Sequence, residues 1–254
     1  MNIAGHAAVI TGGGSGMGAE TGRQLAAAGV KITLLDMNLE AAEAVAREIG
    51  GLAMQCDVAD SASTEAAIAR AREAHGAARI CVNCAGVAPP KKMVGREGPM
   101  PLDSYVKVVN INLVGTFNVM RLVAADMAGL EPVTESGERG VIVNTASIAA
   151  FDGQIGQTAY ASSKAGVVGL TLPAARELAS IGVRVMTICP GLIGTPMLLG
   201  LPQNVQDSLA KQVPFPSRLG RPDEFASLVM HILSNEMLNG EVIRLDGAIR
   251  MAPK

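Results

Sequence analysis

The sequence predicts a single-domain α/β fold of the Rossmann type: a doubly wound parallel sheet of about seven strands with helices on both faces. Runs rich in Val and Ile alternate with Ala-rich helical stretches along the chain, and this alternation is typical of a parallel sheet with crossover helices. Several of the runs, such as Val141-Ile-Val143, are apolar throughout, as buried parallel strands are. No linker or internal repeat divides the chain, so we expect residues 1–254 to form one domain.

The elements follow in order from this alternation. Strands are expected at 6–11, 31–35, 52–56, 79–83, 141–145, 183–189 and 241–245. Helices are expected at 17–28, 39–49, 61–75, 103–128, 158–180 and 223–234. Three segments rich in Gly or Pro interrupt the pattern: 89–101, 129–140 and 190–216. The first and last follow strand carboxyl ends, where open α/β sheets bind ligands, so we expect the substrate loop at about 190–216.

Composition excludes several classes of protein. Hydrophobic residues make up 49% of the chain and charged residues 17%, which excludes disorder, and no run of about 18 uninterrupted apolar residues is present to span a bilayer. The net charge is −2 and aromatic residues are 2%, so we expect no nucleic-acid partner. Four cysteines predict free thiols in a reducing compartment. The first strand begins too early for a signal or transit peptide, and we expect a cytoplasmic protein.

The first strand leads into a glycine-rich turn, Thr11-Gly-Gly-Gly-Ser-Gly-Met-Gly18. Glycine permits a tight turn and close backbone approach, and the N-terminus of the following helix attracts phosphate. The turn therefore predicts a pyrophosphate site. The form G-x-G-x-x-G/A fits only as Gly14, Gly16 and Ala19, so a purely structural turn remains an alternative. The lysine of a P-loop is absent.

Two aspartates follow the next two strands. Asp36 closes the second strand eighteen residues after Gly18, near the spacing at which a carboxylate accepts hydrogen bonds from the adenosine ribose. A carboxylate there repels a 2′-phosphate, which favours NAD over NADP; the alternative is a helix N-cap. Asp57, at the end of the third strand, is either a capping residue or an adenine contact, and its chemistry alone leaves both open.

Three polar side chains near the middle of the chain predict a site of hydride transfer. Ser147 follows a strand, and Tyr160 and Lys164 lie four positions apart in a predicted helix, so the last two share a face. A tyrosine hydroxyl titrates near pH 10 and transfers protons poorly at neutral pH unless a nearby cation stabilises the phenolate, as Lys164 is placed to do. Each residue alone has a structural explanation; their conjunction with the nucleotide turn and Asp36 points to catalysis.

The same residues, with Asn83-Cys-Ala-Gly86, Asn112 and Pro190-Gly191, make the chain resemble a classical short-chain dehydrogenase/reductase over essentially its whole length. Within that family it resembles the type II 3-hydroxyacyl-CoA dehydrogenases, also called 17β-hydroxysteroid dehydrogenases type 10. Four strings carry this finer resemblance: Asn144-Thr-Ala-Ser147, Phe151-Asp-Gly-Gln-Ile-Gly-Gln157, Val213-Pro-Phe-Pro-Ser-Arg-Leu-Gly220 and the segment from Asn239 to Met251.

The resemblance implies a role for each matching residue. It implies Tyr160 as acid/base, Lys164 as its electrostatic partner and ribose ligand, and Ser147 as donor to the substrate oxygen. It implies that Asn112 holds a water linking Lys164 to bulk solvent. Around NAD, besides Tyr160 and Lys164, it implies Gly12, Ser15, Gly16, Met17, Gly18, Asp36, Asp57, Val58, Cys84, Gly86, Pro190, Ile193 and Thr195.

Two features depart from the common pattern of the family. Cys84 stands where the family commonly has Asn, and the tail reads Asp246-Gly-Ala248 in place of Asp-Gly-Gly. Cys81 and Cys84 form a C-x-x-C spacing inside a strand, where alternate residues face opposite ways. No second pair exists, and the three histidines are scattered, so we expect no metal site.

The substrate side of the sequence leaves alternatives open. The loop with Leu192, Ile193 and Met197 to Leu199 either covers an acyl chain or packs on the sheet. Gln154 and Gln157 either donate to a thioester carbonyl or cap the helix. Three basic residues after the fourth strand either meet the phosphates of coenzyme A or, as we expect, form a solvated cluster: Lys91, Lys92 and Arg96.

These observations predict an NAD-dependent dehydrogenase that oxidises the 3-hydroxyl of a short- or medium-chain acyl-CoA. One alternative is oxidation of a hydroxysteroid or another secondary alcohol. An alternative of another class is a scaffold subunit without required catalysis, against which the intact Tyr160–Lys164 pair argues. The resemblance further implies a homotetramer, with helices 103–128 and 158–180 at one interface and the C-terminal tail at another.

Overall fold

The protein is built on one seven-stranded sheet with all neighbours parallel, in the order β3-β2-β1-β4-β7-β8-β9. The computed structural model describes residues 1–253, except for the side chain of Met197. The strands are β1 Ala7–Thr11, β2 Lys31–Asp36, β3 Leu52–Gln55, β4 Ile80–Asn83, β7 Gly140–Thr145, β8 Val183–Pro190 and β9 Val242–Leu245. A separate antiparallel hairpin pairs β5 Val94–Gly95 with β6 Gly98–Pro99.

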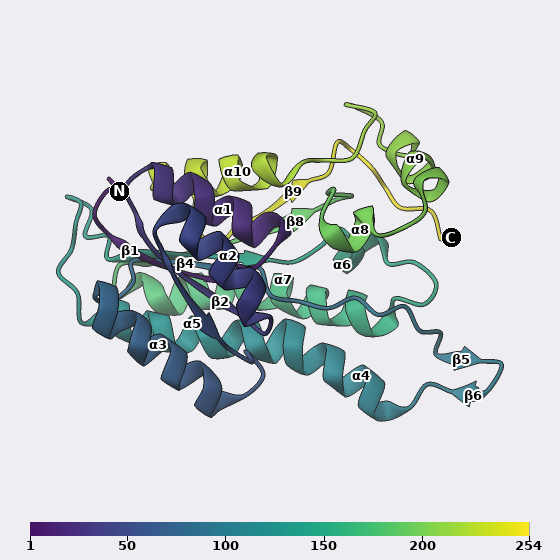
Figure 1. Cartoon of the computed structure of the whole chain (residues 1–254), viewed down its shortest axis with the longest axis horizontal. Helices are drawn as coiled ribbons and strands as arrows, with labels where there is room; N and C mark the ends of the chain where they lie inside the picture. The colour runs from purple at the N-terminus through teal and green to yellow at the C-terminus, as the bar shows by residue number, and fades with distance from the viewer. Residues whose placement is uncertain (254) are drawn as a thin grey trace.

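Helices cover both faces of the sheet (Figure 1). On one face lie α1 Gly16–Ala27, α2 Leu39–Ile49 and α10 Pro222–Ser234, and on the other α3 Ser61–His75, α5 Gly115–Ala128 and α7 Thr158–Ala179. The remaining helices are α4 Leu102–Val109, the π-helical segment η1 Asn110–Val114, α6 Ala149–Asp152, α8 Pro196–Leu199 and α9 Gln203–Lys211. Each face of the sheet has its own buried hydrophobic cluster, so the core has two layers.

The predicted fold class is confirmed, and each predicted strand is present within one or two residues of its expected bounds. Three differences concern the segments between regular elements. The helix expected at 103–128 changes to π-helical winding at Asn110–Val114. The expected loop 190–216 contains the short helices α8 and α9, and segment 89–101 contains the β5–β6 hairpin, which projects from the body in Figure 1.

The strand order places the functional end of the sheet. From β1 the chain goes outward to β2 and β3, and then crosses to β4 on the other side of β1. Crevices at the carboxyl ends of strands beside such a reversal are where doubly wound sheets bind ligands. Several predicted site residues lie at or just after these ends: the glycine turn after β1, Asp36 as the last residue of β2, Cys84 after β4, Ser147 after β7 and Pro190 at the end of β8.

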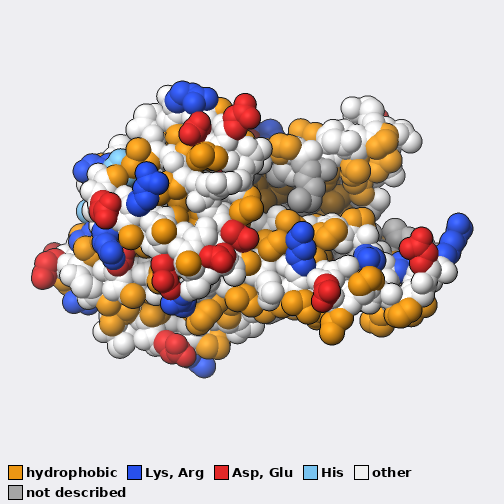
Figure 2. Space-filling model, turned by 60° about the horizontal axis from the view of Figure 1, so that its bottom comes forward, with side chains coloured by type: hydrophobic (Ala, Val, Ile, Leu, Met, Phe, Trp, Pro, Cys, Tyr) orange, Lys and Arg blue, Asp and Glu red, His pale blue; other side chains and the backbone are white. Residues whose placement is uncertain are grey.

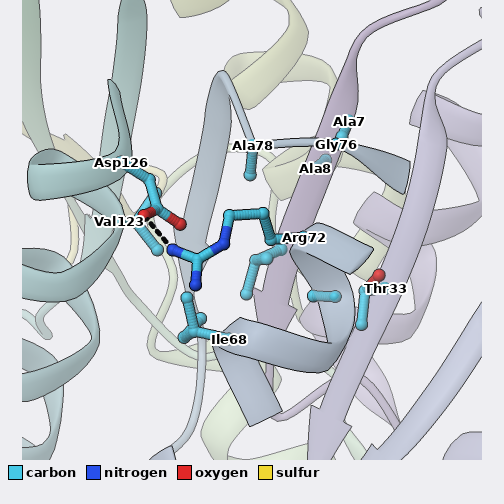
Figure 3. A pocket seen from close by; sticks show the side chains of 11 residues that line it. Ala7, Ala8, Thr33, Ile68, Arg72, Gly76, Ala78, Val123 and Asp126 are labelled. Atoms are coloured by element: carbon cyan, nitrogen blue, oxygen red, sulfur yellow. Dashed lines mark hydrogen bonds and ion pairs between the residues drawn. The ribbon is translucent and has the colours of Figure 1, made fainter. Parts of the chain in front are cut away.

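Two other features of the fold lie apart from this end. The helical run Leu102–Ala128 is long and apolar enough to cross a membrane, with mean hydropathy 1.4, but half of it is buried inside the protein, as in a core helix. A small cavity lies at the amino end of the sheet, between α3, α5 and β1, beside the ion pair of Arg72 and Asp126 (Figure 3). None of the predicted site residues lines it.

Candidate active site

The turn after β1 brings backbone so close to backbone that only glycine fits at two positions. A Cβ on Gly12, where φ is +64°, would lie 2.9 Å from the amide nitrogen of Ala85. A Cβ on Gly18 would overlap the carbonyl oxygen of Gly12. The Thr11 hydroxyl oxygen accepts the N–H groups of Cys84 and Ala85, each at 3.1 Å, and so ties the turn to the β4 end. The result is a cradle of backbone that fits a pyrophosphate.

Helix α1 begins at this turn, and no described side chain caps the backbone N–H groups at its N-terminus. Ser15 occupies the N-cap position, and its exposed side chain makes no capping hydrogen bond within the described residues. No acidic side chain lies in the first turn of α1. Because unsatisfied N–H groups and the helix dipole favour an anion at such an end, Ser15, Gly16 and Met17 fit a phosphate contact.

The position of Asp36 excludes the N-cap alternative. Its carboxylate accepts the N–H of Gly14 and the N–H of Asn38, both at 2.9 Å. The N-cap of α2 is Asn38, whose side chain accepts the N–H of Ala41 at 3.1 Å. Each oxygen of Asp36 can accept a second hydrogen bond, so the carboxylate is oriented by backbone and still able to receive two ribose hydroxyls.

Asp57 is likewise not the cap of its helix. The N-cap of α3 is Asp60, which accepts the N–H of Ser63. The Asp57 side chain bonds within its own loop: its Oδ1 accepts the N–H of Ala59 at 2.9 Å. Of the two alternatives that its chemistry left open, capping of α3 is wrong, and the adenine contact, next to buried Val58, stays a prediction.

Ser147, Tyr160 and Lys164 converge at the carboxyl ends of β7 and β8. Lys164 is 4% exposed, and its Nζ donates to the carbonyl oxygen of Thr145 at 2.8 Å. The same Nζ lies 5.9 Å from the centroid of the Tyr160 ring. Ser147, also buried, lies close enough to Tyr160 to lower the pKa of the Tyr160 hydroxyl. Two hydroxyls and an ammonium therefore face one space, which is what proton transfer to or from an alcohol requires.

Burial is the main cause of the pKa shifts of Tyr160 and Lys164. In the protein alone it raises the pKa of Tyr160 above its usual value, and the hydrogen bond from Ser147 opposes that rise. Burial also lowers the pKa of Lys164 to about 8. We expected Lys164 to lower the pKa of Tyr160. Desolvation dominates instead, because removing a phenolate from water costs more free energy than the interactions with its neighbours recover.

Asn112 and Gly86 close the back of the site. The Asn112 side chain, fully buried, accepts the N–H of Val87 at 2.8 Å and donates to the carbonyl of Val87 at 2.9 Å. It also donates to the Ser163 hydroxyl at 3.0 Å. A Cβ on Gly86 would lie 3.4 Å from Lys164 Nζ. The π-helical turn thus places Asn112 where it clamps the loop after β4 beside Lys164.

The remaining predicted cofactor residues lie around the same crevice. Thr145 donates to the Cys84 thiol, and burial raises the pKa of that thiol to about 11. The chain turns at Pro190 at the end of β8, and Ile193 is buried. A Cβ on Gly16 would lie 3.1 Å from the Thr195 side chain. Thr195, which follows β8, therefore lies directly beside the glycine turn that follows β1.

Residues expected on the substrate side are only partly free to bind. Gln154 Nε2 donates to the carbonyl oxygen of Ala252 at 2.9 Å. Gln157 is the N-cap residue of α7, but its oxygen accepts the N–H of Gln154 and caps no helical N–H. No described residue accepts from the Gln157 amide nitrogen, so it is the better placed donor. Lys91 donates to the Ser104 hydroxyl at 3.2 Å.

The molecule is hollowed at the end that carries α8, α9 and the hairpin, with hydrophobic side chains on the walls (Figure 2). Leu199 and Leu201 are 52% and 42% exposed, and no described residue of α9 is buried. Helix α9 therefore does not serve as a cover for the core. The side chain of Met197, which we expected in this loop, lies outside the described residues.

Sequence reasoning missed two sets of supporting residues. Asn118 donates to the carbonyl oxygen of Val58 and to the Thr64 hydroxyl, both at 3.0 Å, and so holds the loop after β3. Arg244 bridges Asp152 and Asp246. Nothing in the sequence indicated the contacts of Asn118 with Val58 or of Arg244 with Asp152, because these partners are 60 and 92 residues apart. Within residues 1–253, no group of three or more His, Cys, Asp and Glu side chains is placed to hold a metal ion.

Comparison with known proteins places this geometry in context. Residues 6–206 match the family model described as short chain dehydrogenase. The chain is 51% identical to human 3-hydroxyacyl-CoA dehydrogenase type-2 over 99% of its length and 98% of that protein. It is 49% identical to the protein of the same name from Drosophila melanogaster, over 96% of this chain and 97% of that one. A crystal structure of 3-hydroxyacyl-CoA dehydrogenase type-2 from Mycobacterium avium superposes with a TM-score of 0.91 at 44% identity, covering 98% of each chain.

Proposed function

The chain belongs to the short-chain dehydrogenase family, and on this premise we propose that it oxidises the 3-hydroxyl of short- and medium-chain 3-hydroxyacyl-CoA with NAD. The observation that carries the reaction type is the convergence of Ser147, Tyr160 and Lys164 beside a backbone cradle for pyrophosphate. The relatives named 3-hydroxyacyl-CoA dehydrogenase type-2 support the substrate class.

The proposed chemistry assigns one task to each side chain. A nicotinamide nucleotide bound beside these residues would supply the hydride acceptor and a positive charge that favours phenolate at Tyr160. Ser147 holds the substrate hydroxyl, and the Tyr160 phenolate oxygen accepts its proton as the alcohol becomes a ketone. Lys164 donates to the ribose of the cofactor and stabilises the phenolate. Asn112 keeps the loop beside Lys164 in place for the path of the proton to solvent.

Asp36 is the basis for proposing NAD over NADP. Its carboxylate is oriented by two backbone N–H groups and would meet a 2′-phosphate as a like charge. No basic side chain follows it directly, since the next residues are Met37 and Asn38. Asp57, Val58, Cys84, Ile193 and Thr195 complete the proposed NAD contacts.

The substrate would lie in the hollow of Figure 2. Exposed leucines on α8 and after it support an acyl chain there, under a loop that covers it. Gln157 is proposed to donate to the thioester carbonyl, and Gln154 to hold the tail beside it.

We further propose a homotetramer in the cytoplasm. Apolar side chains that are 41–52% exposed lie on the helices expected at one interface: Val106, Val114, Phe117 and Leu172. Such a patch favours burial against another copy. All four cysteines are free, which supports a reducing compartment. Sedimentation at several concentrations tests the tetramer.

One absorbance assay tests the function. NADH formation is followed with 3-hydroxybutyryl-CoA, with a medium-chain 3-hydroxyacyl-CoA, with estradiol and with a simple secondary alcohol, each with NAD and with NADP. We expect the highest kcat/KM for a 3-hydroxyacyl-CoA with NAD. Turnover of estradiol or the simple alcohol without turnover of either thioester would replace the proposed substrate class.

A further inference from the structure

A single arginine on the last strand contacts the segment of chain that joins the two catalytic residues, Ser147 and Tyr160. Arg244 lies on β9, and its Nη2 donates to Asp152 at 2.6 Å. Its guanidinium carbon lies 5.4 Å from the centroid of the Phe151 ring. Both residues belong to α6, which lies between Ser147 and Tyr160 along the chain. Arg244 therefore contacts the one segment whose shape sets where these two hydroxyls stand relative to each other.

The contact depends on the planar fork of a guanidinium. The Nε of Arg244 donates to Asp246 at 2.7 Å while Nη2 reaches Asp152 and the carbonyl oxygen of Ile249. The Asp246 and Asp152 side chains are only 8% and 19% exposed. A lysine carries the same charge on one nitrogen and cannot span both carboxylates in this geometry. Without the bridge, two poorly solvated carboxylates would face each other.

Arg244 also contacts the C-terminal tail, which lies against the same segment between Ser147 and Tyr160. Gln154 donates to the carbonyl of Ala252, and the N–H of Ile155 donates to the carbonyl of Pro253 at 3.0 Å. Ile148, next to Ser147, packs in a buried cluster with Ile249. On the other side, a Cβ on Gly191 would lie 2.8 Å from Asp246. The ion pairs thus link α6, the tail and the turn after β8 into one wall.

We propose that Arg244 is a positioning residue for proton transfer: through Asp152 and Asp246 it fixes segment 148–157, so that Ser147 and Tyr160 address the same substrate oxygen. The inference rests on the proposed function for its assay. It predicts a larger loss of turnover than of cofactor affinity, because among the described residues Arg244 bonds only to Asp152, Asp246 and Ile249, whereas Asp36 is oriented by the N–H groups of Gly14 and Asn38.

The test compares Arg244→Lys and Arg244→Gln with Arg250→Gln as the matched control. Arg250 also pairs with Asp246 but is 62% exposed and does not reach α6. For both Arg244 variants we expect kcat with the best substrate to fall by about 100-fold, since an ångström of misplacement costs this much. The Kd for NAD, measured by fluorescence titration, should stay within twofold, and Arg250→Gln should stay within twofold in both quantities.

The pH profile adds a readout that a purely structural role would not move. Ser147 opposes the rise in the pKa of Tyr160, while Cys189 adds to it and Lys164 lies beside the ring. If Arg244→Lys moves Ser147 away, the pKa of Tyr160 rises further and the oxidation profile shifts to higher pH. An unshifted profile together with wild-type kcat would overturn the proposal.

A double variant separates positioning from folding. In Asp152→Asn/Arg244→Gln one of the two carboxylates left without Arg244 is gone, so the melting temperature should recover in part relative to Arg244→Gln, while kcat should stay low. Recovery of both, or an equal loss of NAD affinity in the single variants, would show that Arg244 only stabilises the fold. If wild type instead prefers another alcohol of the panel, the proposed function fails, and the same comparison is made on that alcohol.

Discussion

The two halves of the candidate site are held together in different ways. Around the glycine turn, the contacts are made by backbone: Asp36 is oriented by two main-chain N–H groups, and Gly18 faces the carbonyl of Gly12. Around the catalytic hydroxyls, the contacts are made by charged and polar side chains, and Arg244 meets Asp152 across 92 residues of sequence.

This difference predicts different sensitivities. A site built from backbone tolerates many side-chain changes but not an added Cβ, because the close approach leaves no room for it. A site built from side chains fails when one functional group is removed, even though its volume is kept. Substitutions that add one methyl group or remove one functional group therefore test whether the two halves of the site differ in this way.

The largest effect is expected for Tyr160→Phe, which removes one oxygen and keeps the ring. Without the proton acceptor, kcat for oxidation should fall by about 1,000-fold, and the Kd for NAD should stay within twofold. NADH absorbance and fluorescence titration measure the two quantities. The chain has one other tyrosine, and Tyr105→Phe, which loses only its contact with Ser162, should keep kcat within a few-fold. Equal effects of the two variants would contradict the assigned chemistry.

Gly18→Ala tests the backbone half with a single methyl group. The new Cβ would overlap the Gly12 carbonyl, so we expect the turn to open, the affinity for NAD to fall by about 100-fold and the stability to fall by ~1–3 kcal/mol. The control is Gly169→Ala, in helix α7 with nothing within 4 Å of its Cβ position. It should stabilise the protein by ~0.5–1 kcal/mol in thermal unfolding. A harmless Gly18→Ala would refute the cradle.

Asp36→Ala tests the one side chain on which cofactor choice depends. Loss of a charge-assisted pair of hydrogen bonds should lower kcat/KM with NAD and shift the ratio of NAD to NADP efficiency by ~10–100-fold towards NADP. Asp60→Ala is the matched control, since it removes an N-cap of α3 and should lower stability by ~1 kcal/mol without changing the ratio. An unchanged ratio in Asp36→Ala would rule out Asp36 as the determinant.

The last prediction concerns the pH dependence of stability. Burial lowers the pKa of Lys164 to about 8, below its value in the unfolded chain, so between pH 8 and about 10.4 the unfolded state binds more protons than the folded state. Stability should therefore rise with pH in this window because of Lys164, and this contribution should be constant below it.

Lys164→Met removes that contribution. Relative to the variant, the unfolding equilibrium constant of the wild type should fall by up to ~10-fold per pH unit across the window. Denaturant titrations of both proteins at pH 7, 8, 9 and 10 measure it. Parallel curves for the two proteins would mean that Lys164 keeps its ordinary proton affinity in the folded state.

Most of the regular elements could be predicted from sequence, because their signals are local. The helices expected at 39–49 and 61–75 agree with the structure to the residue, because Ala-rich runs between Val- and Ile-rich runs are visible in the sequence itself. The strands were found for the same reason. The change of winding at Asn110–Val114 could not be predicted, because it depends on the contacts of Asn112 with Val87 and Ser163 from other segments.

The site divides along the same line. Gly12, Gly16 and Gly18 lie in one short string, and Tyr160 and Lys164 lie one helical turn apart, so their relation could be inferred without coordinates. Asp57 could not be resolved between its two roles until Asp60 was found to cap α3. Arg244 and Asn118 gave no signal, since the groups that they hold belong to distant parts of the chain.

From the sequence by itself follow the parallel sheet, the place of the phosphate turn and the identity of the reacting groups, because periodicity and short spacings encode local conformation. Three features depend on the tertiary structure: the low pKa of Lys164, the orientation of the Asp36 carboxylate by backbone N–H groups, and the ion pair of Arg244 with Asp152 in the segment between Ser147 and Tyr160. Desolvation and ion pairing depend on what surrounds a group in space, and that environment comes into being only when remote segments pack together.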